Sequence, residues 1–397
     1  MSVFGVLTLW AVSAFGQASD TMLQAKIFAA NRVERTRVGN SFAIDMVLPD
    51  YVVVTAPSNQ LEEIKKLGFA YEVLKSRGFP EADKEYHTYA QTNDELDALV
   101  KEFPGLVQKV TIGKSLEGRA MNGVRISSSS LQDSLPTAIF VGCHHAREHL
   151  SVEVPLRLAR HLAANYSKDG RIKGLLDSRE VWIVPMVNPD GAEYDISTGS
   201  YKWWRKNRKN NGNSTYGVDL NRNYGAYWGG EGSSGSPSSD TYRGTSAFSE
   251  PETQAVRDFV RARKHATVLL TFHTFSELIL WPWGYRDESI SDEKDRNVFE
   301  TMGKKMATWN HYTPEKSSEL YLTSGDTTDW AYDELKIFAF TFELSPSSLG
   351  GGGFYPGASV IDPVVKDNIE PALYLIENSK DPYAVVGRSH IDPLGIL

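Results

Sequence analysis

The chain has 397 residues, of which 41% are hydrophobic, so it can bury a large core. Its formal net charge of −8 and its mostly scattered basic residues argue against a nucleic-acid-binding protein. The single cysteine, Cys143, excludes an intrachain disulfide, which fits a cytosolic protein or a secreted one stabilised by size or metals. The length suggests two or three domains, but one large α/β domain with a small one fits as well.

The N-terminal segment has the pattern of a secretion signal. Residues 3–12 form an apolar run of signal-peptide length, and the small residues Ala14, Gly16 and Ala18 follow it. The run is too short for a permanent membrane span, and no Lys or Arg precedes it. A buried N-terminal helix is the alternative. We expect residues 1–18 to be a signal peptide and the mature protein to be soluble and secreted to the extracellular space.

A small α+β unit is expected over residues 19–77. Apolar patterns predict strands at residues 42–48, 51–56 and 71–74. A short helix is predicted at residues 61–67. The unit ends in the polar sequence Lys75-Ser76-Arg77-Gly78. An exposed Arg between two folded units is open to proteases, so we expect cleavage near Arg77.

The rest of the chain alternates strands and helices. Strands are predicted at residues 106–112, 122–126, 137–141, 180–187, 268–273, 278–281 and 337–343. Longer helices are predicted at residues 152–166, 251–263 and 364–377. This alternation indicates an α/β fold in which a mixed, largely parallel twisted sheet is covered by helices on both faces, preceded by the small α+β unit.

Candidate metal ligands follow two of the apolar strands. In an open parallel sheet, ligands bind at the carboxyl ends of strands, and His145 and Glu148 come directly after strand 137–141. This His-x-x-Glu pair alone is a weak signal, and a surface turn with satisfied polar groups explains it better. His273, at the end of another apolar strand, changes that weighting, because a catalytic zinc takes three protein ligands and one open position.

Glu343 is a candidate general base. It lies at the end of an apolar, aromatic strand, where a carboxylate is costly to bury unless it is used. Beside zinc it can take a proton from the metal-bound water, whose pKa zinc lowers to about 7.

Several arginines near these positions indicate an anionic group on the substrate. Arg147 lies two residues after His145, and segments 204–208 and 218–223 supply further Arg and Asn residues. Arg binds a carboxylate through two hydrogen bonds, which Lys cannot imitate. A solvated charged face remains a sufficient explanation for Lys202, Lys206 and Lys209.

These segments together resemble the zinc carboxypeptidases of the carboxypeptidase A and B family, and most of all the bacterial carboxypeptidase T branch. The similarity runs from about residue 79 to residue 389, and the order and spacing of its motifs agree. The segments that carry it are residues 79–80, 86–89, 144–148, 188–191, 204–208, 219–224, 233–239, 272–280 and 329–332.

The resemblance implies the composition of the catalytic centre. One zinc ion would be held by His145, Glu148 and His273. The neighbouring His144 and His149 would not bind it. Glu343 would act as general base in the attack of zinc-bound water and then as proton shuttle, and Asp219 would orient His145 from behind.

The resemblance also implies how a peptide is bound. Arg147 and Arg208 would polarise the scissile carbonyl and stabilise the oxyanion. The terminal carboxylate of the substrate would be held by Asn221, Arg222 and Tyr321. The partners would thus be peptide and protein C-termini, with no nucleic acid and no membrane, and the enzyme is expected to be a monomer.

Residues 19–77 would be an inhibitory prosegment and residues 78–397 the catalytic domain. The prosegment would cover the active-site mouth until an activating protease cuts near Arg77. Carboxypeptidase T-like enzymes also bind calcium, which the resemblance allows here without assigned residues. Phe275 stands where many animal relatives carry Tyr.

The specificity pocket is expected to accept two classes of side chain. Seven residues after Tyr321, where A-type enzymes are apolar and B-type enzymes acidic, the chain has Thr328, and an acid appears instead at Asp326. We therefore expect cleavage after apolar and aromatic residues and, more slowly, after Lys and Arg. In the alternative, Asp326 points into solvent or caps a turn.

Two other functions fit parts of the pattern. The same fold could serve a deacylase or cell-wall-peptide hydrolase that removes an unusual C-terminal residue. A binding module with an inactive site would lack the base or a zinc ligand. The base Glu343 and the ligands His145, Glu148 and His273 are all present.

Overall fold

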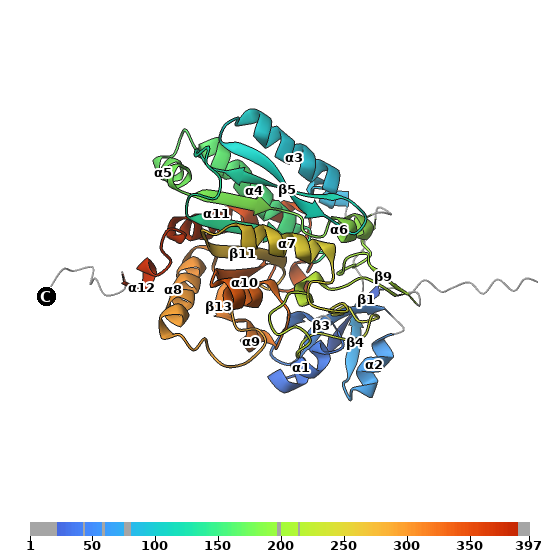
Figure 1. Ribbon diagram of the computed structural model, residues 1–397. Coiled ribbons are helices and arrows are strands. Elements are labelled where there is room, and N and C mark those ends of the chain that lie inside the picture. Colours follow the sequence, from blue (N-terminus) through green and yellow to red (C-terminus); the bar gives the residue numbers. More distant parts are fainter. Residues whose placement is uncertain are drawn as a thin grey trace, which may run out of the picture.

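The computed structural model describes residues 22–387 except residues 43, 58–59, 75–80, 197–199 and 213–214. The predicted signal peptide and the predicted cleavage site near Arg77 lie outside the described residues. The rest forms a large α/β domain and a small α+β unit, residues 22–74, which we call the N-terminal module (Figure 1). None of the helices within the described ranges is long and apolar enough to cross a membrane.

An eight-stranded sheet forms the centre of the large domain. Its strands are β5 (Val107–Lys114), β6 (Ala120–Ile126), β7 (Thr137–Gly142), β8 (Glu180–Val184), β11 (Ala266–Thr274), β12 (Leu278–Trp281), β13 (Thr313–Lys316) and β14 (Phe338–Leu344). Their order across the sheet is β13-β12-β14-β11-β7-β8-β6-β5. The central strands β14, β11, β7 and β8 run parallel, and β6, β5 and β12 pair antiparallel. This confirms the mixed, largely parallel sheet.

Helices cover both faces of this sheet, as predicted (Figure 1). One face packs against α3 (Tyr89–Glu102), α4 (Leu150–Asn165), α5 (Gly170–Ser178), α8 (Glu293–Asn310) and α11 (Ile361–Asn378). The other packs against α7 (Pro251–Ala262) and α10 (Thr327–Leu335). Shorter elements are η2 (Glu81–Glu85), α6 (Pro189–Ile196), β9 (Asn210–Gly212), β10 (Thr215–Tyr216), η3 (Leu220–Arg222), α9 (Ser317–Leu320), η4 (Leu349–Gly351), η5 (Ala358–Val360) and α12 (Ala384–Gly387).

The apolar sequence of β7 explains why both faces are covered. Successive side chains of a strand point to opposite faces, so Ala138 and Phe140 join one core and Ile139 and Val141 join the other. Every residue of β7 is buried. Such a strand is stable only between two layers of helices, and its carboxyl end therefore emerges at an edge of the sheet.

The N-terminal module has its own sheet and core. Its elements are β1 (Met22–Ile27), α1 (Arg32–Gly39), β2 (Ile44–Val47), β3 (Val52–Pro57), α2 (Leu61–Lys66) and β4 (Tyr71–Leu74). The strands pair antiparallel in the order β2-β3-β1-β4. Buried side chains such as Ile27, Val54 and Ile64 pack between the sheet and the two helices. This module is the small α+β unit expected from the sequence.

The opposite face of the module's sheet packs on the large domain. Val53, adjacent to the core residue Val54, is fully buried in a cluster with Trp203, Phe275 and Phe354. At the edge of this contact, hydrogen bonds join residues 40, 41 and 60 of the module to residues 232, 239 and 238 of the large domain. The segment around residues 232–239 is thus partly covered by the module.

Candidate metal centre and active site

Three predicted ligands lie together at the carboxyl edge of the sheet. His145 follows β7, Glu148 precedes α4, and His273 is the penultimate residue of β11. Nδ1 of His145 lies 2.7 Å from one oxygen of Glu148, and Nδ1 of His273 lies 3.0 Å from the other. The two Nδ1 atoms are 3.1 Å apart. One ligand atom from each residue falls within 4.8 Å of the others, and all three side chains are buried.

The residues behind the cluster fit zinc. Nε2 of His145 lies 3.2 Å from Oδ1 of Asp219, the residue predicted to orient it, and Nε2 of His273 lies 3.2 Å from Oγ1 of Thr271. Each imidazole can therefore donate outward from Nε2 and keep its Nδ1 lone pair for a metal. Burial alone would raise the pKa of Glu148, but the charges of His145 and His273 lower it. Two nitrogens and one anionic oxygen match the donor set of a catalytic zinc site.

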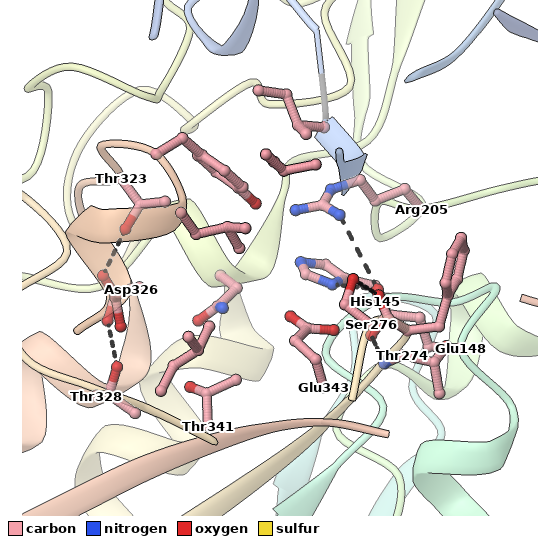
Figure 2. Close-up of a pocket in the computed structure, with 18 of the residues that line it drawn as sticks. His145, Glu148, Arg205, Thr274, Ser276, Thr323, Asp326, Thr328, Thr341 and Glu343 are labelled. Atoms are coloured by element: carbon pink, nitrogen blue, oxygen red, sulfur yellow. Dashed lines mark hydrogen bonds and ion pairs between the residues drawn. The ribbon is translucent and has the colours of Figure 1, made fainter. Parts of the chain in front are cut away.

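Glu343 joins the cluster through strand register. In the parallel pairing of β11 with β14, His273 lies opposite Glu343, so both stand at the same level of the sheet. Glu343 lines an open cavity together with His145 and Glu148 (Figure 2). Burial, and then the negative charge of Glu148, raise the pKa of the Glu343 carboxyl well above its usual range. Such a carboxylate is a stronger base than an exposed one.

The cation beside the metal cluster is Arg205, a correction to the prediction. Arg205 lines the cavity, and its guanidinium lies 4.0 Å from Oε1 of Glu148 (Figure 2). Its Nε donates to Oδ2 of Asp219 at 3.0 Å, so Asp219 contacts both Arg205 and His145. Burial alone would raise the pKa of Asp219, but the charges of Arg205 and His145 hold it well below its usual range.

Arg208, predicted to stabilise the oxyanion, lies elsewhere. Its guanidinium stacks 3.5 Å from the ring centre of Tyr194 and 4.7 Å from that of Trp204, with Tyr216 also close. These aromatic rings draw the cation away from the cavity. The local sequence does not predict which of the two arginines faces the cavity. Asp219, which binds Arg205, and Tyr194 and Tyr216, which contact Arg208, lie outside segment 204–208.

Arg147 is also absent from the described residues that line the cavity. It is fully buried, donates to the carbonyl of Trp203 at 3.3 Å and stacks 4.4 Å from the ring centre of Phe354. Phe354 itself lines the cavity. Arg147 therefore supports the aromatic wall of the cavity, and the structure does not bring it to the metal cluster.

The predicted carboxylate-binding residues also meet at this cavity. Asn221, Arg222 and Tyr321 all line it. Arg222 donates to the carbonyl oxygens of Gly232 and Asn221, which fixes its guanidinium. Burial raises the pKa of Tyr321, and the positive charges of Arg222 and Arg205 act in the opposite direction.

Asp326 both lines the cavity and caps a helix. Its Oδ1 accepts hydrogen bonds of 2.8 Å from the backbone N of Asp329 and from Oγ1 of Thr328, and Oδ2 accepts one from Thr323 at 3.1 Å (Figure 2). The predicted pocket position and its capping alternative are thus both realised. Thr323 and the further wall residues Leu280, Ser317 and Thr341 were not predicted.

The N-terminal module closes part of this cavity. Ile44 and Val47 from β2 are among the residues that line it. Tyr321 packs against the module's apolar core beside Val47 and Leu67. A ribbon in the colour of the module runs next to Arg205 in Figure 2. The module therefore lies over the arginine and tyrosine side of the site.

Comparisons with known proteins agree with this site. The profile of the family described as zinc carboxypeptidase matches residues 92–371. A zinc carboxypeptidase of Saccharothrix mutabilis subsp. capreolus is 36% identical over 339 residues, which are 83% of this chain and 78% of that protein.

Solved structures give the same result. Carboxypeptidase A from Helicoverpa armigera matches with a TM-score of 0.77 and 26% identity, covering 92% of this chain and 98% of that one. The structure titled thrombin activatable fibrinolysis inhibitor matches with a TM-score of 0.73 and 25% identity, covering 91% of this chain and 100% of that one. With its His-Glu-His metal site and this similarity along most of its length, the chain belongs to the zinc carboxypeptidase family.

Proposed function

We propose that this metallocarboxypeptidase is made as a secreted, inactive precursor, and that it removes single apolar, aromatic or basic residues from peptide C-termini by water attack with Glu343 as the base. The observation that carries the mechanism is the convergence on one cavity of the metal cluster, Glu343, Arg205 and the predicted carboxylate-binding residues. Calcium binding and a monomeric state remain predictions without assigned residues.

Glu343 is suited to move the proton. Zinc, when bound by His145, Glu148 and His273, supplies Lewis acidity to a carbonyl oxygen and to the attacking water. The raised pKa of Glu343 lets its carboxylate accept a proton from that water and return it to the nitrogen of the leaving amino acid. Because Glu343 and the metal ligand His273 are register partners, the base and the metal site are held by the same pair of strands.

Arg205 and the carboxylate-binding residues divide two anionic tasks. Arg205 lies next to Glu148, so it is placed to donate to the oxygen of the scissile carbonyl as negative charge develops there. Arg222, with Asn221 and Tyr321, would bind the terminal carboxylate, which restricts cleavage to the last peptide bond.

The function is tested with Glu343→Gln. The substitution keeps the shape of the side chain and removes the base, so zinc should remain bound while turnover falls by about 10²–10⁴-fold. Turnover is measured by mass spectrometry of single residues released from peptides, with a zinc chelator as the second inactive arm. Release of internal fragments, or turnover by the variant near that of the wild type, would contradict the proposal.

The two arginines of segment 204–208 give a matched pair. Arg205→Ala removes a donor to the oxyanion and should lower kcat by about 10²–10³-fold. Arg208→Ala removes a cation that stacks on Tyr194 and is not among the described residues that line the cavity, so kcat should change by less than about threefold. The lost cation–π contact should lower stability by only about 0.5–1 kcal/mol. Both kcat values are measured on one small peptide, and the reverse ranking would restore the role to Arg208.

Asp326 supports the dual specificity. Its carboxylate lies on the cavity wall, so a basic side chain can approach it. The hydroxyls of Thr323 and Thr328 donate to Asp326, which partly satisfies its charge. With Leu280 on the same cavity, an apolar side chain also finds contacts. A carboxylate partly satisfied in this way should favour apolar residues over basic ones.

Asp326→Asn should reduce cleavage after Lys and Arg. The loss of a charged partner corresponds to about 1–3 kcal/mol of transition-state free energy, with cleavage after Leu and Phe almost unchanged. Asn can still cap α10 through Oδ1. Values of kcat/KM for the four C-terminal residues provide the measurement, and Asp292→Asn, at the cap of the distant helix α8, is the matched control. Equal losses for both classes would assign Asp326 to structure alone.

The module's position supports the precursor. Its strand β2 lines the cavity, and its sheet buries Val53 on the aromatic wall. The match to the thrombin activatable protein covers 91% of this chain, whereas residues 81–397 are only about 80% of it, so the similarity extends into the N-terminal residues. Secretion is supported by the predicted signal peptide in residues 1–18.

Undocking the module should activate the uncut chain. Val53→Asp places a charge in an apolar contact, which costs several kcal/mol, so the uncut variant should hydrolyse a small peptide at least about tenfold faster than the uncut wild type. Val73→Asp, at a position 46% exposed on β4, is the control. Limited trypsin treatment should bring wild type and both variants to one activity. An uncut wild type as active as the treated chain would remove the precursor role.

A further inference from the structure

His144 is a fully buried histidine that the metal site does not use. It precedes the metal ligand His145, but its ring lies stacked beside that of His273, with ring centres 5.6 Å apart. Its Nε2 lies 2.8 Å from the hydroxyl of Tyr224, which packs in the core and holds the ring in place. A buried imidazole with partners on both nitrogens is oriented, and those partners show what it connects.

Four hydrogen bonds run through His144 from the metal cluster to the carboxylate-binding residues. Nε2 of His273 lies 3.2 Å from Oγ1 of Thr271, and that oxygen lies 3.3 Å from Nδ1 of His144. On the other side of the ring, Nε2 of His144 lies 3.2 Å from Oγ1 of Thr327. Oγ1 of Thr327 donates to Oδ1 of Asn221 at 2.8 Å.

The side chain of Asn221 determines which groups donate along this series of hydrogen bonds. The backbone N of Thr327 also donates to the same atom of Asn221, at 2.9 Å, which identifies it as the amide oxygen. The Thr327 hydroxyl therefore donates to Asn221, and its oxygen can accept from Nε2–H of His144, a donor that it shares with the hydroxyl of Tyr224. A neutral imidazole that donates from Nε2 accepts at Nδ1, so Thr271 donates to His144.

The same direction suits the metal end. Because the Thr271 hydroxyl donates to His144, its oxygen accepts from Nε2–H of His273. That leaves the Nδ1 lone pair of His273 facing Glu148, where a metal would bind. At the opposite end, Asn221 accepts through Oδ1, which leaves its amide N–H groups as donors on a side chain that lines the cavity.

We propose that His144 is a positioning residue whose two nitrogens orient a metal ligand and a carboxylate-binding amide at once, through Thr271 on β11 and Thr327 on α10. The proposal rests on the roles of His273 and Asn221 in the proposed function. It explains why a histidine is needed here, since a neutral imidazole accepts on one side and donates on the other along one line.

The two threonines allow the hydrogen bonds on either side of His144 to be removed separately. Thr271→Val keeps the side-chain shape and leaves Nε2 of His273 without its partner. Losing such a partner typically lowers metal affinity by about 10–100-fold, so zinc should pass to a chelator faster by about the same factor. Its KM should stay within about twofold of wild type. Thr327→Val should do the opposite: zinc release should be normal, and KM should rise about threefold to tenfold, the effect of one neutral hydrogen bond.

Reference variants make each outcome decisive. Thr92→Val is the matched control, because Thr92 is buried and its hydroxyl has no hydrogen-bond partner among the described residues. His144→Phe should show both effects together. Zinc release is measured on the full-length chain, and KM on the form in which the wild type is active. If Asn221→Ala leaves KM unchanged, the proposed role of Asn221 fails; if it raises KM and the two Thr→Val variants show no split, the role of His144 is overturned.

Discussion

The active site depends on the parallel pairing of β7, β11 and β14. Carboxyl ends of parallel strands meet at one edge of a sheet, and here those ends carry His145, His273 and Glu343. The backbone ladder fixes their relative heights, with His273 directly opposite Glu343. The sheet is buried on both faces, so a shift in register would disturb two cores at once. The positions of the predicted metal ligands and of Glu343, the proposed base, are therefore a property of the whole fold.

Asp219 carries the same constraint outward from the sheet. One of its oxygens contacts His145 and the other accepts from Arg205. A single buried carboxylate thus sets the distance between a metal ligand and the cation beside it. Its own charge is stabilised only because both partners are present, since burial alone would favour the neutral acid. Removing either Arg205 or His145 would therefore destabilise the buried charge of Asp219.

Much of this arrangement could be predicted from the sequence. The strand at residues 278–281 has the predicted bounds, and α4 and α7 lie within two residues of theirs, because strong apolar patterns mark them. Helix α8 was not predicted: its first seven residues carry four charges, and its buried positions include the polar residues Asp295 and Asn310. The ligands were predictable because a His or Glu at the end of an apolar strand is conspicuous. The choice of Arg205 over Arg208 depends on partners that only the folded chain brings together.

The contact through Val53 has a consequence for what happens in solution. In one chain, the module and the large domain are tethered, and each meets the other at an effective concentration of about the millimolar range. If the chain is cut between them, the same contact becomes an encounter between two molecules, and dilution then favours separation. Val53 and the aromatic residues Trp203, Phe275 and Phe354, which are buried together in the intact chain, would then be exposed to solvent. Two apolar surfaces that were buried in the intact chain then become liabilities for solubility, most of all for the small module.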